Sequence, residues 1–299
     1  MIPTPDPAPE DLQNFWQSLT EEAHSQPLDF HLSKTQHPDC PEFVVSRIEF
    51  RAMQGRRLSG WLAHPEGARR LPSFLWIPPY GRESVLPNQY GTRRDMASMS
   101  LNFHGHDSFH QEAYLPDRGY LAEGSENPSN WILGRMYQDA VIALRVLRAQ
   151  IEVDEDRLAV AGMSQGAGIA VWMGAFCQLV RTVCADMPFL AAMQTTLEKP
   201  VYRYPLKELI DYSETIPAGM ERIRHTLSYF DTVNIAAFCK VPTLVSLGLK
   251  DPASRPDHVR ALYAALPGEK ELIEYPSGHD WHEEMVENNR SWMLEHLSS

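Results

Sequence analysis

The sequence predicts an α/β fold in which a mostly parallel central sheet is flanked by helices. Two observations support this fold class. Short apolar runs typical of buried strands alternate with segments of helical periodicity, which is the pattern of a parallel sheet. The chain has 299 residues, 43% of them hydrophobic, so it can bury the core of one large domain. We therefore predict a single domain over residues 1–299.

The first half of the chain begins with an N-terminal extension, residues 1–42, which contains a helix at Pro9–Ala23. Proline near the first turn and acidic residues after it are typical of a helix start. Alternating apolar and polar residues on both sides of Gln54–Arg57 predict a β-hairpin. The predicted elements of this half are the hairpin strands Phe43–Met53 and Leu58–His64, the buried strands Ser73–Ile77 and Ser98–Phe103, and an amphipathic helix at Ile132–Arg148.

The second half repeats strand and helix, with one interruption. The predicted elements are a polar turn at Val153–Arg157, strands at Leu158–Ala161, Thr182–Ala185, Pro242–Gly248 and Glu271–Tyr275, and helices at Ile169–Phe176, His258–Ala265 and Asn289–Leu297. Residues from about 188 to 235 break the alternation with helix-like segments. We interpret them as a cap inserted over the carboxyl ends of the strands, where sites of such sheets lie.

One motif lies at the centre of this pattern: Gly162-Met-Ser164-Gln-Gly166 between a predicted strand and a predicted helix. It matches Gly-x-Ser-x-Gly, the nucleophile elbow of the α/β-hydrolases. The glycines leave room for a tight turn that exposes the serine hydroxyl. The alternative is a Gly-Ser turn without chemistry, but the flanking strand and helix favour a nucleophile at Ser164.

A serine nucleophile needs a histidine base and a carboxylate that orients it. In this fold the order along the chain is serine, acid, histidine, with each residue just after a strand. Asp251 and His279 fit that order. The alternative for Asp251 is a plain turn role, and Asp186 is a rival acid for which we favour a structural role. The rivals of His279 are His104, His106 and His282, and we expect His282 to lie within a helix.

An oxyanion hole needs two N–H donors. Gln165 follows the serine and begins the helix, so its N–H is one donor. The second donor should come from the loop after the third predicted strand, Pro78-Pro-Tyr80-Gly81. Proline has no N–H, so Tyr80 and Gly81 are the candidates.

Composition excludes other classes of partner. The net charge of −12 argues against nucleic acid and anionic membranes.

The chain has four cysteines, Cys40, Cys177, Cys184 and Cys239, and they form no Cys-x-x-Cys pair. We therefore expect reduced thiols, and a disulfide between Cys177 and Cys184 is the less favoured alternative. We interpret the cluster His104, His106, Asp107 and His110 as loop residues, and we expect no metal and no organic cofactor. The amino terminus does not resemble a secretory signal, which favours a cytoplasmic protein.

With these residues placed, the chain resembles the acetyl xylan esterase / cephalosporin-C deacetylase family (carbohydrate esterase family seven). Matching blocks run from about residue 43 to 282. They are Arg157–Gly168 around the serine, Arg118–Tyr120 with Arg135–Asp139, the segments Ala185–Leu190 and Leu227–Ala237 that flank the cap, and the acid and base loops Gly248–Asp251 and Tyr275–His279.

The resemblance implies a serine esterase that removes acetyl and other small acyl groups from sugars, xylo-oligosaccharides and cephalosporin C. It implies Ser164, Asp251 and His279 as the catalytic triad, the N–H groups of Tyr80 and Gln165 as the oxyanion hole, and a homo-oligomer, commonly a hexamer. The sequence departs from the family pattern at Ala167, in the loop Asn102–Asp107 and in the loop Pro78–Ser84. A different ester or peptide substrate is therefore an alternative, and a non-catalytic binding protein is a less favoured one.

Overall fold

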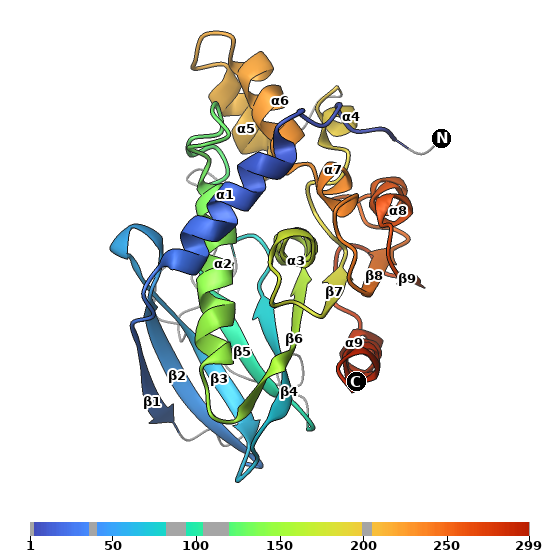
Figure 1. Cartoon of the computed structure of the whole chain (residues 1–299). Helices are drawn as coiled ribbons and strands as arrows, with labels where there is room; N and C mark the ends of the chain where they lie inside the picture. Colours follow the sequence, from blue (N-terminus) through green and yellow to red (C-terminus); the bar gives the residue numbers. More distant parts are fainter. Residues whose placement is uncertain (1–2, 36–40, 82–93, 104–119, 199–204, 299) are drawn as a thin grey trace.

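A twisted nine-stranded sheet organises the part of the chain that the computed structural model describes, residues 3–35, 41–81, 94–103, 120–198 and 205–298 (Figure 1). The strand order is β1-β2-β3-β5-β4-β6-β7-β8-β9. The strands are β1 (Phe30–Thr35), β2 (Phe43–Arg51), β3 (Arg57–Pro65), β4 (Leu71–Ile77), β5 (Ala97–Asn102), β6 (Val153–Met163), β7 (Thr182–Asp186), β8 (Thr243–Gly248) and β9 (Lys270–Tyr275).

Strand direction divides the sheet into two parts. The hairpin β2–β3 and its neighbours β1 and β5 pair antiparallel, whereas β5, β4 and β6 to β9 run parallel to one another. The carboxyl ends of the parallel strands therefore meet at one edge, where the loops after them can share a site. This is the mostly parallel α/β sheet that the sequence predicts.

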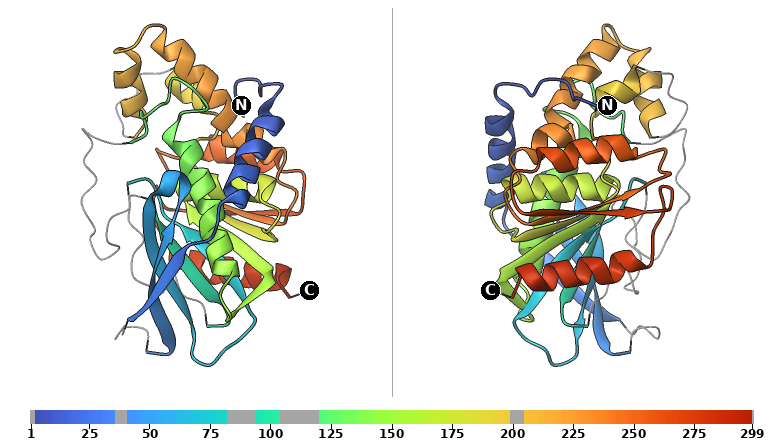
Figure 2. Two further views of the ribbon diagram at one scale, coloured as in Figure 1. Left: turned by 60° about the vertical axis from the view of Figure 1, so that its left-hand side comes forward. Right: turned by 90° about the vertical axis from the view of Figure 1, so that its right-hand side faces the viewer.

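Helices cover both faces of the parallel part. Successive strand residues belong to different cores, for example Leu75 and Val160 to one and Phe74 and Ala159 to the other. The first core is closed by α2 (Ile132–Arg148), α3 (Gln165–Phe176) and α8 (Pro256–Ala265), and the second by α9 (Glu284–His296) (Figure 2). Both faces of these strands are buried, which explains their continuous apolar runs.

The helix of the N-terminal extension, α1 (Leu12–Ser25), packs against α2 (Figure 1). Trp16 is fully buried, stacks on Tyr137, and donates its indole N–H to the carbonyl of Tyr229 at 2.9 Å. Leu12, Trp16 and Ala23 of α1 are thus buried against the rest of the chain.

The segment predicted as a cap contains α4 (Met193–Leu197), α5 (Leu206–Ser213), α6 (Gly219–Phe230) and α7 (Thr232–Ala236). Asp231, fully buried, ties two of these helices together. One carboxylate oxygen accepts the N–H groups of Val233 and Ala192, at 2.9 and 3.0 Å, and the other accepts the N–H of Met193 at 2.9 Å. Burial raises the pKa of Asp231 to about 6. The role of this segment as a cap stays a prediction.

The structure corrects the sequence prediction at three elements and at one residue. Val153–Arg157 is not a turn but the start of β6. Glu155 and Asp156 are exposed in this part of the strand, so its sequence lacks the apolar run of the buried strands. Strand β1 was not predicted, since it is a short edge strand in which no residue is fully buried. Helix α9 begins at Glu284 rather than Asn289, and His282 precedes it instead of lying within it.

Within the described ranges, no helix is both long and apolar enough to cross a membrane.

Candidate active site

The turn from β6 to α3 places Ser164 in a strained backbone conformation, with φ 57° and ψ −117°. The glycines on either side are required by close backbone contacts. A Cβ atom on Gly162 would lie 2.5 Å from the carbonyl of Gly166, and one on Gly166 would lie 2.0 Å from the carbonyl oxygen of Ile77. Such strain is maintained only where the surroundings hold it, and it is typical of functional turns.

Backbone hydrogen bonds to β7, to the segment after it and within α3 hold the strained turn. The N–H of Ser164 donates to the carbonyl of Asp186 at 2.9 Å. The carbonyl of Ser164 accepts the N–H groups of Gly168 and Phe189, at 3.1 and 3.0 Å. The serine side chain is thereby directed to the carboxyl edge of the sheet.

A chain of two hydrogen bonds joins three residues predicted from the sequence. The Nε2 atom of His279 lies 3.0 Å from Oγ of Ser164, and its Nδ1 atom lies 2.6 Å from Oδ2 of Asp251. Asp251 follows β8 and His279 follows β9, so both lie at the edge that carries the serine. The Asp251 side chain is fully buried, whereas that of His279 is 24% exposed.

The second oxygen of Asp251 is occupied by the backbone. Its Oδ1 atom accepts the N–H groups of Ala253 and Ser254, at 2.7 and 2.9 Å. The acid and base loops also touch, because a Cβ on Gly248 would lie 2.3 Å from the carbonyl oxygen of Gly278. These contacts fix the carboxylate so that only Oδ2 faces the imidazole.

The rival residues lie elsewhere or outside the described residues. His282 stacks its ring on Tyr275, with centroids 4.6 Å apart. Asp186 accepts hydrogen bonds from Ser246 at 2.6 Å and from Asn289 at 2.7 Å, which links β7, β8 and α9. Asp251 occupies the Nδ1 side of His279, the position for which Asp186 was the rival. His104 and His106 fall outside the described residues.

The two candidates for the second oxyanion donor differ in their contacts. The N–H of Gly81 donates to the hydroxyl of Tyr120 at 3.2 Å, which favours Tyr80 over Gly81 as the donor. Gln165 is the first residue of α3, and N–H groups in the first turn of a helix have no partner within it. Tyr80 follows β4, beside the β6 strand that carries the serine turn.

The side chains of the two donor residues make contacts that the sequence did not predict, with Tyr120 and Glu208. We call Tyr80, Tyr120, Gln165 and Glu208 the tyrosine cluster. The hydroxyl of Tyr80 donates to Glu208 at 2.6 Å, and the hydroxyl of Tyr120 donates to Oε1 of Gln165 at 3.0 Å. The two tyrosine rings have centroids 4.3 Å apart. Burial raises the pKa of Tyr120 well above its ordinary range, so its hydroxyl stays protonated. Only the position of Tyr120 in the Arg118–Tyr120 block signalled its importance in the sequence.

The described cysteines are thiols, and metal-binding clusters are not found among the described positions. Cys177, Cys184 and Cys239 are free and buried, so Cys177 and Cys184 do not form the disulfide that was the alternative. Within the described ranges, no group of three or more His, Cys, Asp or Glu residues could hold a metal ion. Cys40 and the cluster His104, His106, Asp107 and His110 lie outside those ranges.

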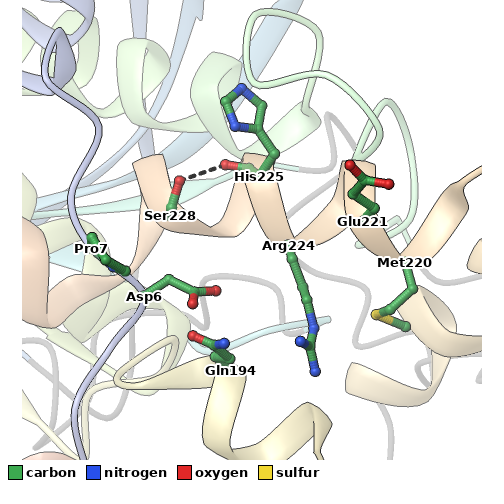
Figure 3. A pocket seen from close by; sticks show the side chains of 8 residues that line it. All are labelled: Asp6, Pro7, Gln194, Met220, Glu221, Arg224, His225 and Ser228. Atoms are coloured by element: carbon green, nitrogen blue, oxygen red, sulfur yellow. Dashed lines mark hydrogen bonds between the residues drawn. The ribbon is translucent and has the colours of Figure 1, made fainter.

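A separate pocket of about 490 Å³ lies between the N-terminal segment, α4 and α6 (Figure 3). Asp6, Gln194 and Arg224 converge on it, and His225 also lines it. None of the residues around the serine lines this pocket. The pocket is therefore separate from the hydrogen-bonded chain Ser164–His279–Asp251.

Comparison with known proteins identifies the family of the chain. The family profile described as acetyl xylan esterase (AXE1) matches residues 3–298. The chain is 22% identical, over 284 residues, to acetyl esterase Axe7A of Xylanibacter ruminicola, covering 91% of this chain and 64% of that protein. It thus spans less than two thirds of that relative's length.

Two solved structures share the fold. The acetyl xylan esterase from Paenibacillus sp. R4 superposes with a TM-score of 0.87 at 24% identity, over 99% of this chain and 97% of that one. Acetyl xylan esterase 1 from Thermoanaerobacterium sp. JW/SL YS485 gives 0.85 at 23% identity, over 100% and 96%. The fold is therefore that of the α/β-hydrolase esterases, and, because the family profile spans nearly the whole sequence, the chain belongs to the acetyl xylan esterase family.

Proposed function

We propose that this protein is a serine carboxylesterase that removes acetyl groups from acetylated sugars and xylo-oligosaccharides. The observation that carries the proposal is the hydrogen-bonded chain from Ser164 through His279 to Asp251. Membership of the acetyl xylan esterase family supports the ester class and the acetyl group. The reaction requires no metal and no organic cofactor.

In the first half of the reaction, Oγ of Ser164 attacks the carbonyl carbon of the ester. Nε2 of His279, 3.0 Å away, takes the hydroxyl proton as the new C–O bond forms. The tetrahedral intermediate then collapses, the bond to the sugar oxygen breaks, and the imidazolium returns the proton to the departing alcohol. An acetyl-serine remains.

In the second half, a water molecule loses its proton to His279 and attacks the acetyl-serine. Collapse of the second intermediate releases acetate, and the proton returns to Oγ of Ser164. Asp251 acts throughout by holding the Nδ1–H tautomer of His279 and by stabilising the imidazolium. The contacts of its other oxygen with Ala253 and Ser254 support this role.

Both intermediates carry a negative oxygen, which we assign to the N–H groups of Tyr80 and Gln165. The N-terminus of α3 adds the positive end of the helix dipole at the same place. A donor of this kind is typically worth about 10²–10³-fold in rate.

Two finer expectations rest on the family resemblance: activity on cephalosporin C and assembly into a homo-oligomer that is commonly a hexamer. A third, a cytoplasmic location, rests on the amino-terminal sequence. They stay predictions beside the esterase proposal.

Acetate release from acetylated xylo-oligosaccharides, measured for the wild type beside Ser164→Ala, tests the proposal. We expect release by the wild type and its loss in the variant. A Ser164→Ala protein with wild-type turnover would exclude the serine mechanism. A folded wild type that releases acetate from neither xylo-oligosaccharides nor cephalosporin C, yet cleaves longer p-nitrophenyl esters, would overturn the acetyl assignment and retain the nucleophile.

A further inference from the structure

We propose that Tyr120 and Glu208 are positioning residues that hold the two oxyanion donors at a fixed separation and angle. The inference rests on the proposed esterase function and concerns the same site. Neither residue needs to touch the substrate. Both act through hydrogen bonds to Tyr80, Gly81 and Gln165, the residues that carry or adjoin the donors.

Tyr120 bridges the two sides of the oxyanion hole with one hydroxyl group. Its oxygen accepts the N–H of Gly81 at 3.2 Å, and its O–H donates to Oε1 of Gln165 at 3.0 Å. The first bond fixes the plane of the Tyr80–Gly81 peptide, which is rigid and directly follows the peptide that carries the Tyr80 N–H. The second bond fixes the side chain of Gln165 at the first position of α3. A single hydroxyl thus links the loop after β4 to the helix after the serine.

Glu208 holds the same loop through a second set of hydrogen bonds. Its Oε1 atom accepts the hydroxyl of Tyr80 at 2.6 Å, and its Oε2 atom accepts the N–H of Leu121 at 2.9 Å. The hydroxyl of Tyr80 also accepts the N–H of Tyr120 at 3.0 Å. Glu208 is only 7% exposed, and a buried carboxylate with these partners is held firmly.

The tyrosine cluster joins two separate parts of the fold through Glu208. Glu208 lies on α5, within the segment predicted as a cap, whereas Tyr80 and Gln165 lie at the edge of the sheet. The hydrogen bond between Tyr80 and Glu208 therefore connects that segment directly to an oxyanion donor. Movement of α5 would release the Tyr80 side chain and loosen the hole.

Tyr120→Phe and Glu208→Gln test the inference with minimal change of shape. The first removes only the bridging hydroxyl and keeps the ring against Tyr80. The second replaces one acceptor oxygen by a donor, so the hydroxyl of Tyr80 or the N–H of Leu121 loses its partner on the residue. Tyr212→Phe is the matched control, because Tyr212 lies on the same helix as Glu208, α5. The substitution removes a tyrosine hydroxyl that donates to Glu126 at 3.0 Å.

We expect Tyr120→Phe and Glu208→Gln to lower kcat for p-nitrophenyl acetate by about 10-fold or more with little change in KM. The loss is smaller than the 10²–10³-fold typical of deleting a donor, because the donors remain and only their aim is loosened. The inhibition constant of phenylboronic acid, which forms a tetrahedral adduct with the serine, should rise in parallel. The double variant should lose less than the product of the single losses, since both residues act on the same donors.

The inference is overturned if both variants keep kcat and boronic acid inhibition within about two-fold of the wild type. It is equally overturned if Tyr212→Phe loses as much kcat as they do, because the effect would then be one of general stability. Ser164→Ala, measured alongside, separates the two proposals. Full turnover in Ser164→Ala would remove the esterase mechanism, whereas an inactive Ser164→Ala with an unaffected Tyr120→Phe would remove this inference alone.

Discussion

Replacing Asp251 by asparagine should reverse the tautomer of His279 while leaving the fold intact. The Oδ1 position accepts two backbone N–H groups, from Ala253 and Ser254. Asparagine must place its amide oxygen there to keep both bonds, which turns its NH₂ group toward Nδ1 of His279. A donor at 2.6 Å forces Nδ1 to become an acceptor. The ring proton then moves to Nε2, which can no longer accept the proton of Ser164.

The expected loss is large because the base itself is disabled. A wrong tautomer in such an arrangement typically lowers kcat by about 10⁴-fold, which corresponds to about 5 kcal/mol in the activation free energy. Initial rates with p-nitrophenyl acetate near neutral pH measure this loss. The thermal unfolding midpoint should change little, because the amide has the same shape and keeps both backbone contacts. Asp257→Asn is the matched control, since that carboxylate pairs with Arg255 at the half-exposed start of α8.

The reasoning would be refuted if Asp251→Asn kept more than about a tenth of the wild-type kcat, because the tautomer argument requires a loss of several orders of magnitude. It would also be refuted if the unfolding midpoint fell sharply and the loss of activity followed the unfolded fraction.

Three further predictions concern stability. Trp16→Ala should lower the free energy of unfolding by about 3–5 kcal/mol, because the indole is fully buried. Urea unfolding measures this loss, and an unchanged midpoint would contradict the packing of α1. Gly166→Ala should lower the free energy of unfolding by at least about 1–3 kcal/mol, since its Cβ would meet the carbonyl of Ile77. It should also abolish labelling of the protein by a fluorophosphonate probe, and normal labelling would argue against the tight turn. Burial raises the pKa of both Asp139 and Asp231 to about 6, from 3.8. Between pH 3.8 and about 6, the folded state therefore binds more protons than the unfolded state. The contribution of these two carboxyl groups to the free energy of unfolding is complete below about pH 4 and is lost as the pH rises through 6. Urea unfolding at pH 5 and 7 should show a smaller decline for Asp231→Asn than for the wild type, and an equal decline would count against the shift.

Much of the fold could be predicted from the sequence because its parallel strands are buried on both faces. Such strands appear as continuous apolar runs, and helix α2 was predicted with the bounds that the structure has, Ile132–Arg148. The prediction failed where burial is partial. The start of β6 and the edge strand β1 carry exposed polar residues, so composition alone does not distinguish them from turns.

The residues of the hydrogen-bonded chain could be named in advance because each follows a recognisable strand. The tight turn at Ser164 also has a local signature, since its close backbone contacts exclude side chains at Gly162 and Gly166. The roles of these residues in catalysis stay a proposal that the substitutions above test.

Local sequence thus determined the strands, the serine turn and the loops that carry Asp251 and His279, because each depends on residues that are neighbours in the chain. Only the tertiary structure decided which distant side chains meet. Tyr120 and Glu208 are separated from Tyr80 by long stretches of chain, and no periodicity relates them to it. Their contacts exist because the sheet, the helix after the serine and α5 converge at one edge. That convergence results from packing between distant parts of the chain, which no single segment encodes.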